Sequence, residues 1–211
     1  MSGCDAHWVA RPEGPVRSRG KNTVSDTASS SVQPSTLQIR VGLGQDTHRL
    51  QDGGPLRLGG IVIEWHRHLV GHSDADVLLH AVVDALLGAA GLGDIGEWFP
   101  DTDDAHRGRD SATMVSYVWQ HLKREGWAVV NLDCVVCAEE PRLGPYKRLI
   151  ASRIAELVEV TPDQVGVKAK TGEKVGPVGR REAITATCVV LLQRVGARFP
   201  SVTGSDSKTA T

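Results

Sequence analysis

The residues best suited to chemistry are an aspartate and two histidines from separate parts of the chain. Asp46 and His48 stand two residues apart where the strand-like run 38–44 (QIRVGLG) ends, so their side chains are expected to point the same way. His80, from a following helix, would complete a set of one oxygen and two nitrogens with a fourth position open, as at catalytic zinc. The alternative is a chance Asp-x-His pair beside a hydrogen-bonded core histidine.

His80 lies in the stretch around which the chain is organised, residues 71–103 (GHSDADVLLHAVVDALLGAAGLGDIGEWFPDTD). Ser73 or Asp74 is the expected helix N-cap, because a short oxygen-bearing side chain accepts the free amides of the first turn. Apolar residues then recur at helical spacing and predict a face turned to the core: Val77, Leu78, Ala81, Val82, Ala85 and Leu86. Three polar residues one turn apart are expected to share a metal-friendly face: Asp76, His80 and Asp84.

A loop rich in carboxylates follows this helix. It supplies further candidates: Asp94, Gly96, Phe99, Asp101 and Asp103. Carboxylates close to a cation can hold Mg²⁺, and they can accept hydrogen bonds from the hydroxyl groups of a polyol. The alternative is a solvated turn in which the aspartates cap helices.

Glycine, lysine and arginine dominate residues 168–181 (KAKTGEKVGPVGRR). Small residues leave backbone amides accessible and the basic side chains add positive charge, so the segment suits a phosphate. Glu173 within it is a candidate metal ligand. The Gly-x-x-x-x-Gly-Lys-Ser/Thr order of a P-loop is absent from this segment. A flexible basic loop between strands is the alternative.

A fourth candidate segment, residues 138–144 (AEEPRLG), joins an expected strand to an expected helix. Its backbone groups are suited to hold a nucleobase, with Arg142 near a phosphate. Taken alone, the segment is better explained as an ordinary connection.

The composition excludes several classes of function. Twenty-four basic and 25 acidic side chains leave a formal net charge of -1, which gives no electrostatic footprint for nucleic acid or an anionic membrane. No apolar run approaches the roughly 20 residues of a membrane-spanning helix. Cys134 and Cys137 form a Cys-x-x-Cys in a strand-like run without a turn, so we interpret them as buried strand cysteines rather than a redox or zinc pair. A reducing cytoplasm is the expected location.

Strand and helix patterns alternate along residues 38–195, which favours one compact α/β domain with a mixed sheet. The expected strands are 38–44, 56–58, 61–64, 127–138, 165–168 and 183–193, and the expected helices, besides the central one, are 111–125 and about 141–158. Residues 1–37 are expected to be a disordered extension, with a transit peptide for the plastid stroma as the alternative. Residues 196–211 are expected to be a flexible tail.

Three segments together resemble one known family. They read RVGLGQDTH from Arg40, GHSDADVLLHAVVDALLGAAGLGDIGEWFPDTD from Gly71 and VKAKTGEKVGPVGRREAI from Val167. In order and spacing the chain resembles, over Arg40 to about Gln193, the 2-C-methyl-D-erythritol 2,4-cyclodiphosphate synthase family of the non-mevalonate isoprenoid pathway. The combination of Asp-x-His, His-Ser-Asp-x-Asp-x-x-x-His and Gly-Asp-Ile-Gly is specific to that family.

The resemblance implies a fold and a reaction. The implied fold is a ferredoxin-like α/β subunit in which a mixed sheet packs on helices. Three such subunits would form a homotrimer with active sites between neighbours. The reaction, that of a phosphorus–oxygen lyase, converts 4-diphosphocytidyl-2-C-methyl-D-erythritol 2-phosphate to 2-C-methyl-D-erythritol 2,4-cyclodiphosphate and CMP by intramolecular phosphoryl transfer. The implied partners are this CDP-linked small molecule and further copies of the chain, with no nucleic acid and no membrane.

The resemblance also implies roles for single residues. Zinc would be held by Asp46, His48 and His80, the transition state steadied by His72 and Thr171, and a second divalent cation, Mg²⁺ or Mn²⁺, held with the help of Glu173. The implied substrate contacts are Asp46, His48, His72, Ser73, Lys170, Thr171 and Glu173 around the phosphates; Asp94, Gly96, Phe99, Asp101 and Asp103 around the methylerythritol; Ala138, Arg142, Leu143 and Gly144 around the cytidine; and Arg180 at the central cavity of the trimer.

The chain departs from the family pattern at two places. Lys170 and Gly172 flank Thr171 where a run of threonines is common, so some hydroxyl contacts to phosphate are gone. Pro177 stands where a phenylalanine is common near the central cavity, which weakens the case for an isoprenoid diphosphate there. Two other functions stay open: a zinc-dependent pyrophosphohydrolase of nucleoside diphosphate adducts, and a non-catalytic trimer that senses an isoprenoid diphosphate.

Overall fold

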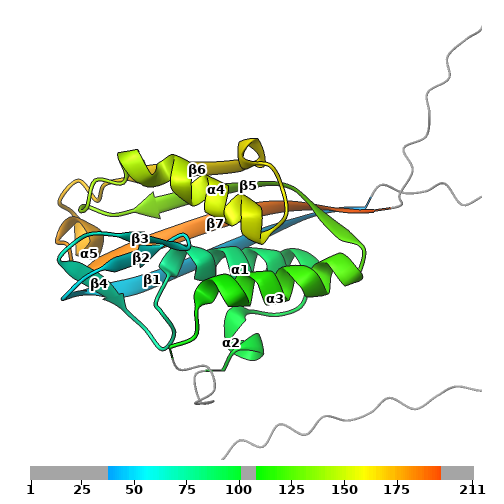
Figure 1. Cartoon of the computed structure of the whole chain (residues 1–211), viewed down its shortest axis with the longest axis horizontal. Coiled ribbons are helices and arrows are strands. Elements are labelled where there is room, and N and C mark those ends of the chain that lie inside the picture. Colours follow the sequence, from blue (N-terminus) through cyan, green and yellow to red (C-terminus); the bar gives the residue numbers. More distant parts are fainter. Residues whose placement is uncertain (1–37, 101–107, 196–211) are drawn as a thin grey trace, which may run out of the picture. The chain divides into compact units, whose positions relative to one another are not determined.

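The computed structural model of the protein describes residues 38–100 and 108–195 (Figure 1). Several expectations lie outside the described residues: the extension 1–37, the tail 196–211, and the candidate ligands Asp101 and Asp103. Within the described part, strands and helices alternate from Ile39 to Arg194.

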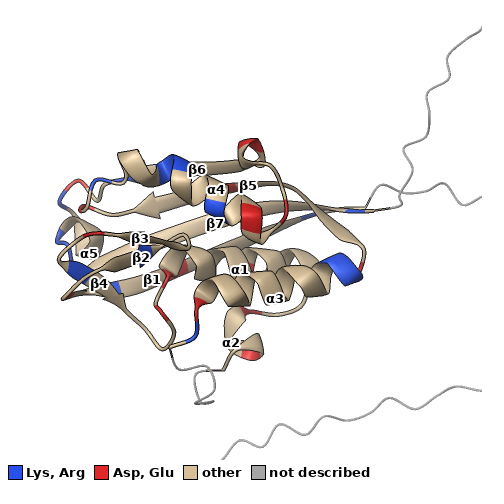
Figure 2. Cartoon of the chain, in the orientation of Figure 1, with Lys and Arg blue, Asp and Glu red and all other residues tan. Residues whose placement is uncertain are grey.

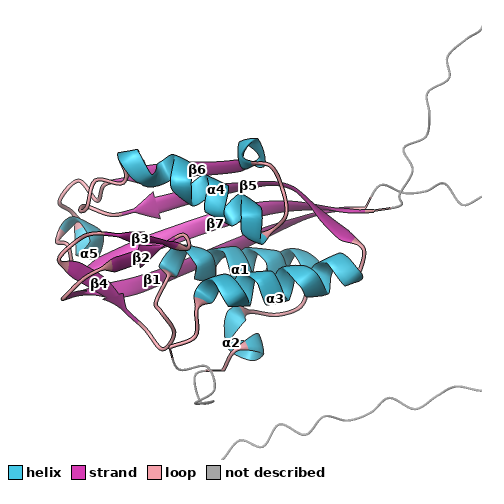
Figure 3. Cartoon of the chain, viewed as in Figure 1, coloured by secondary structure: helices cyan, strands magenta, loops and turns pink. Residues whose placement is uncertain are grey.

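Five strands form one mixed sheet in the order β4-β1-β7-β5-β6 (Figure 3). Their bounds are β1 Ile39–Asp52, β4 Arg67–Val70, β5 Trp127–Cys137, β6 Val165–Lys170 and β7 Ala183–Arg194. In this sheet β5 and β6 run parallel, because the chain returns between them through helix α4 (Lys147–Leu157), and the other neighbours are antiparallel. The expected α/β class with a mixed sheet is confirmed.

Three helices lie on one face of the sheet, with α1 (Val77–Ala90) over β1 and β7, α4 over β6, and α3 (Ser111–Arg124) beside α1 (Figure 1). The expected hairpin forms from β2 (Leu56–Leu58) and β3 (Ile61–Ile63). Two one-turn helices, α2 (Ile95–Trp98) and α5 (Gly176–Gly179), lie in the loops. The helices of the described ranges are all too short or too polar to cross a bilayer.

Helix α1 approaches β1 through two glycines. A Cβ atom on Gly42 would lie 1.9 Å from the carbonyl oxygen of Ala85, and one on Gly44 would lie 2.0 Å from that of Ala81. Neither position therefore has room for a side chain. The apolar residues expected in the core are fully buried in α1: Val77, Leu78, Ala81, Val82, Ala85 and Leu86.

Ser73 or Asp74 was predicted as the N-cap of helix α1. That prediction is wrong, because the helix begins later in the chain. Ala75 takes a left-handed backbone conformation (φ 57°), so the chain turns there and Asp76 becomes the last extended residue. Asp76 is therefore the N-cap, and its carboxylate accepts the backbone amides two and three positions ahead.

Asp76 is also tied to the β2–β3 hairpin. Its carboxylate is fully buried and accepts the amides of Gly59 and Gly60 at 2.8 and 2.7 Å. Backbone donors from two elements thus occupy both of its oxygens. This corrects the expectation that Asp76 shares a metal-friendly face with His80.

Other boundaries differ from the expectation for local reasons. Strand β1 continues to Asp52, so the Asp-x-His pair lies within the strand and not at its exit. Helix α4 begins at Lys147 and not near Pro141, because Gly144–Tyr146 forms a 3₁₀ turn before it. Strand β4 is a short edge strand that pairs with β1. Its four residues show no apolar alternation, so the sequence pattern did not predict it.

The prediction of buried strand cysteines is confirmed for Cys134 and is wrong for Cys137. Cys134 is buried on β5 opposite Cys188 of β7, while Cys137 is partly exposed near the end of the strand. A strand turns successive side chains to opposite faces, so residues three apart diverge. All three described thiols are free.

The sheet face away from the helices carries apolar side chains at the surface. Val41 and Leu43 of β1 are 66% and 64% exposed, and Val189, opposite Leu43 in the register, is 39% exposed. The middle of the sheet is drawn mostly without charged residues in Figure 2. Contiguous exposed apolar surface of this kind is typical of a surface that another chain covers.

Replacing Asp76 by alanine is expected to destabilise the domain by about 3 kcal/mol, because buried amides lose a shared acceptor. The matched control is Asp110→Ala at the N-cap of α3, where the carboxylate accepts the Ala112 amide. We expect that variant to cost about 1 kcal/mol. Denaturant unfolding measures both, and equal losses would contradict the role given to Asp76.

Candidate metal centre and substrate cavities

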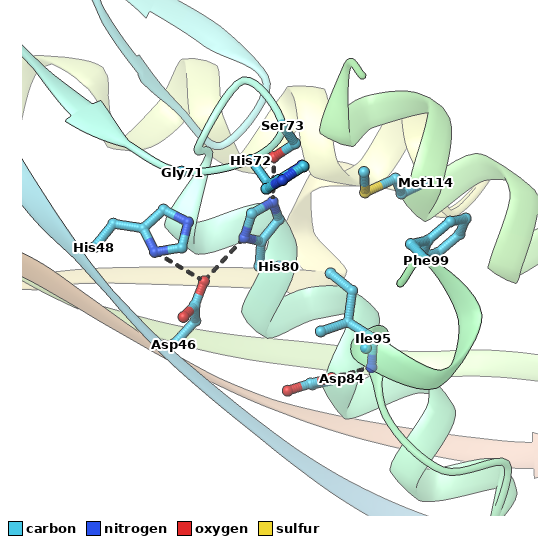
Figure 4. Close-up of a pocket in the computed structure, with 11 residues that line it drawn as sticks. Asp46, His48, Gly71, His72, Ser73, His80, Asp84, Ile95, Phe99 and Met114 are labelled. Carbon is cyan, nitrogen blue, oxygen red and sulfur yellow. Dashed lines mark hydrogen bonds and ion pairs between the residues drawn. The ribbon is translucent and has the colours of Figure 1, made fainter. Parts of the chain in front are cut away.

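The Asp46 carboxylate lies between the rings of His48 and His80 (Figure 4). Its Oδ2 atom is 2.9 Å from Nδ1 of His80 and 3.6 Å from Nδ1 of His48. Each residue offers one candidate ligand atom, and these atoms lie within 4.8 Å of one another. The predicted convergence of a strand pair and a helix histidine is confirmed.

The strand and the helix place these side chains by simple periodicity. Asp46 and His48 are two apart in β1, so both point to the face that α1 covers. His80 lies on the first turn of α1 and is 9% exposed. The three groups therefore meet at the edge of the core, with His80 buried and with Asp46 and His48 partly exposed.

His48 has a ring nitrogen ready for a cation. Its Nδ1 lies 3.0 Å from the Thr47 carbonyl oxygen and close to the Asp46 carboxylate, two acceptors that favour a proton on Nδ1. Its Nε2 then carries the lone pair, is buried, and has no hydrogen-bond partner in the described ranges. A buried acceptor without a partner costs free energy unless it binds something.

Asp46 is prepared for the same role. Burial acts to raise its pKa, but the hydrogen bond with His80 and the charges of both histidines together outweigh burial and hold the pKa below its ordinary value. The carboxylate is therefore ionised at neutral pH, the form that binds a cation. One carboxylate oxygen with two imidazole nitrogens fits a divalent metal.

A cavity of about 280 Å³ opens beside the three residues. Predicted residues that line it are Asp46, His48, His72, Ser73, His80, Gly96 and Phe99, and the others are Gly71, Asp84, Ile95 and Met114. Asp84, which helical period placed beside His80, accepts the Ile95 amide at 2.8 Å. Burial, helped by the charges of nearby aspartates, raises the pKa of Asp84 despite that bond.

Asp94 makes a different contact from the one expected. It caps α2 by accepting the Glu97 amide at 3.0 Å and does not line the cavity. The capping alternative therefore describes this residue in the present structure.

A second cavity, of about 780 Å³, joins two segments that the sequence separates. Its lining includes the predicted residues Ala138, Arg142, Leu143, Gly144, Lys170 and Thr171. The Ala138 amide donates to the Lys170 carbonyl at 2.9 Å, and the Gly172 amide donates to Glu139 at 3.1 Å. The two cavities have no lining residue in common.

Glu173 and Arg180 line neither cavity. Glu173 accepts the Thr171 hydroxyl at 2.5 Å. Arg180 is exposed and donates twice to Glu182, at 2.8 and 3.0 Å. Within a single chain, Glu173 and Arg180 therefore do not reach the cavity beside Asp46.

A mixed α/β domain with an Asp-His-His centre beside a cavity defines a metal-binding protein with the ligand set of a metal-dependent enzyme. The YgbB family matches residues 39–193, and the chain belongs to that family. The relative from Synechococcus sp. (strain JA-2-3B'a(2-13)), named 2-C-methyl-D-erythritol 2,4-cyclodiphosphate synthase, is 53% identical over 154 residues, 73% of this chain and 98% of that protein. The family expected from the sequence is confirmed.

Solved structures agree. A 2C-methyl-D-erythritol-2,4-cyclodiphosphate synthase in a CDP-bound form is 36% identical, with a TM-score of 0.67 over 72% of this chain and 99% of that one. The bifunctional IspDF from Campylobacter jejuni is 37% identical, with a TM-score of 0.73 over 75% of this chain. The match spans 43% of that longer bifunctional chain.

We expect purified protein to carry about one divalent metal ion at this centre. The His48→Ala and His80→Ala variants are each expected to lose the ion, because the two remaining ligands bind it too weakly. Elemental analysis after dialysis measures this. His68→Ala, which removes a ring that contacts the Gly53 carbonyl outside this cavity, is the control and should keep its metal. Full metal content in both centre variants would contradict the assignment.

Proposed function

We propose that the chain closes 4-diphosphocytidyl-2-C-methyl-D-erythritol 2-phosphate into 2-C-methyl-D-erythritol 2,4-cyclodiphosphate and releases CMP. An oxygen of the 2-phosphate bonds to the β-phosphorus, and the bond from that phosphorus to the CMP oxygen breaks with its electron pair. The observation that carries the proposal is the convergence of Asp46, His48 and His80 in a chain of this family.

The physical problem is repulsion between two phosphates. Two unit charges 4 Å apart repel by about 4 kcal/mol at an effective dielectric constant near 20, and each phosphate carries at least one. The attacking oxygen is already an anion, so no side chain has to remove a proton from it. The chain's residues therefore have to position the two groups and offset their charge.

Zn²⁺ is the proposed occupant of the centre, where it supplies a Lewis acid to the phosphate oxygens. His72 and Ser73 line the same cavity and are proposed to contact those oxygens. Thr171 is proposed to steady the transition state with His72. Glu173 is proposed to help to hold the second cation, Mg²⁺ or Mn²⁺, with Lys170 adding positive charge.

The second cavity is the proposed cytidine site. The backbone of residues 138–144 offers fixed donors and acceptors to the base, and Arg142 adds charge for the phosphates. A solved relative with CDP bound supports this choice. The methylerythritol is proposed to contact Asp94, Gly96 and Phe99 with the loop to Asp103.

A homotrimer with active sites between neighbours is proposed as the working form. Two observations support it: the metal and nucleotide cavities of one chain share no lining residue, and the sheet face around Leu43 and Val189 is apolar and exposed. In that assembly Arg180 is proposed to face the central cavity, where Pro177 provides no aromatic ring for an isoprenoid ligand.

The proposed catalytic domain is residues 38–195, with 1–37 an extension and 196–211 a tail. The cytoplasm is the proposed location, because free thiols suit a reducing compartment. Import into a plastid stroma by residues 1–37 is the alternative.

With Mg²⁺ or Mn²⁺ and the CDP-linked substrate, the protein is expected to release CMP and a cyclic diphosphate in equal amounts, while His48→Ala does neither. Phosphorus NMR identifies the product. The reaction in ¹⁸O-labelled water separates transfer within the substrate from hydrolysis. Labelled oxygen in a linear product would indicate a pyrophosphohydrolase and overturn the proposal.

Mixing two inactive variants tests the shared site. Thr171→Ala damages the nucleotide side and His48→Ala the metal side, so each homotrimer is expected to be inactive. Random mixed trimers place both intact halves together in about a quarter of the sites, so a comparable fraction of activity returns. Mixed trimers without activity would contradict a site built by two chains.

A further inference from the structure

Polar side chains hold the His80 ring on the side away from Asp46, and one of them, Ser111, is buried. Its Nε2 lies 2.9 Å from Ser111 Oγ, and that hydroxyl donates to Asp74 Oδ1 at 2.5 Å. Ser73 Oγ is also 2.9 Å from Nε2. Ser111 is fully buried and His80 is 9% exposed, so water has little access to the bond between these two residues.

The bonds run in one direction. The Ser111 hydroxyl proton is committed to the Asp74 carboxylate, so the Ser111 oxygen accepts from His80. When Nδ1 binds a cation, the proton of the neutral ring sits on Nε2, where the Ser111 oxygen accepts it. Nδ1 lies 2.9 Å from the Asp46 carboxylate, so a cation bound between them takes the place of the hydrogen bond that joins the two groups.

The fold places Ser111 for this task. Ser111 is the first residue of α3, and the chain just before it is hydrogen-bonded to the loop that precedes α1. The Gly108 amide donates to the His72 carbonyl at 2.9 Å, and the Asp74 amide donates to the Arg109 carbonyl at 3.1 Å. Ser111 and Asp74 are therefore fixed relative to each other by backbone bonds.

We propose that Ser111 and Asp74 are positioning residues, which fix the tautomer and ring orientation of His80 so that Nδ1 faces Asp46. This rests on the proposed function only in that His80 is a metal ligand. Neither residue needs to touch the metal or the substrate. Partners of this kind typically change metal affinity by about 10- to 100-fold.

The test is the Zn²⁺ affinity of metal-free protein, measured by competition with a chelator. Ser111→Ala and Asp74→Ala are each expected to bind Zn²⁺ about 10- to 100-fold more weakly. Since the two residues act through one series of hydrogen bonds, the double variant should lose little more Zn²⁺ affinity than the single variant that binds Zn²⁺ less tightly. With Co²⁺ as a probe, the visible absorption of Ser111→Ala should differ from that of the unaltered protein.

Thr113→Ala is the matched control. Thr113 lies on the same turn of α3, but its hydroxyl donates to the Asp110 carbonyl and not to the site. It should leave Zn²⁺ affinity unchanged. Fully additive losses, or a Ser111→Ala variant with unchanged affinity and only a lower melting temperature, would overturn the proposal.

The outcomes also separate two failures. Metal lost in His48→Ala but kept at full affinity in Ser111→Ala and Asp74→Ala would defeat this inference alone. An unaltered protein that binds no Zn²⁺ would defeat the proposed function itself. Should Ser111→Ala fail to fold, Asp74→Ala on the partly exposed loop decides by the same affinity measurement.

Discussion

The close contact of α1 with β1 is the constraint on which the site depends. Gly42 and Gly44 present no side chain to the helix, whose carbonyl oxygens would lie 1.9 and 2.0 Å from any Cβ placed there. Because the helix lies so near, His80 reaches Asp46 at 2.9 Å across two elements. A methyl group at either glycine would separate the strand from the helix and open the centre.

The chemistry of the centre follows from how this contact places charge. Burial alone would favour a neutral Asp46, but the two histidines reverse that preference and keep a carboxylate at the edge of an apolar core. Neither described cavity is lined by a cysteine, so a covalent thiol intermediate has no support there. Positioning and charge are what the lining offers, which is what phosphoryl transfer within one substrate requires.

The sequence predicts what depends on periodicity and misses what depends on a distant contact. The apolar spacing of α1 predicted a buried helix, and the two-residue step from Asp46 to His48 predicted that both side chains lie on one face of the strand. The cap was missed because Ser73, Asp74 and Asp76 all bear a suitable oxygen, and the left-handed turn at Ala75 decides among them.

Ser111 shows the same limit at the site. It is an ordinary serine at a helix start, and its role depends on packing against a histidine 31 residues away. The one-turn helix α2 was likewise predicted as loop, because four residues give no period. In both cases tertiary contacts carry the information that local pattern lacks.

Anomalous diffraction at the zinc absorption edge, from crystals grown with CDP, tests the central claim most directly. The account predicts an ion bound by a carboxylate oxygen of Asp46, Nε2 of His48 and Nδ1 of His80, with its open position toward a phosphate oxygen. An ion bound elsewhere, with these three side chains turned apart in protein that still releases CMP, would contradict it.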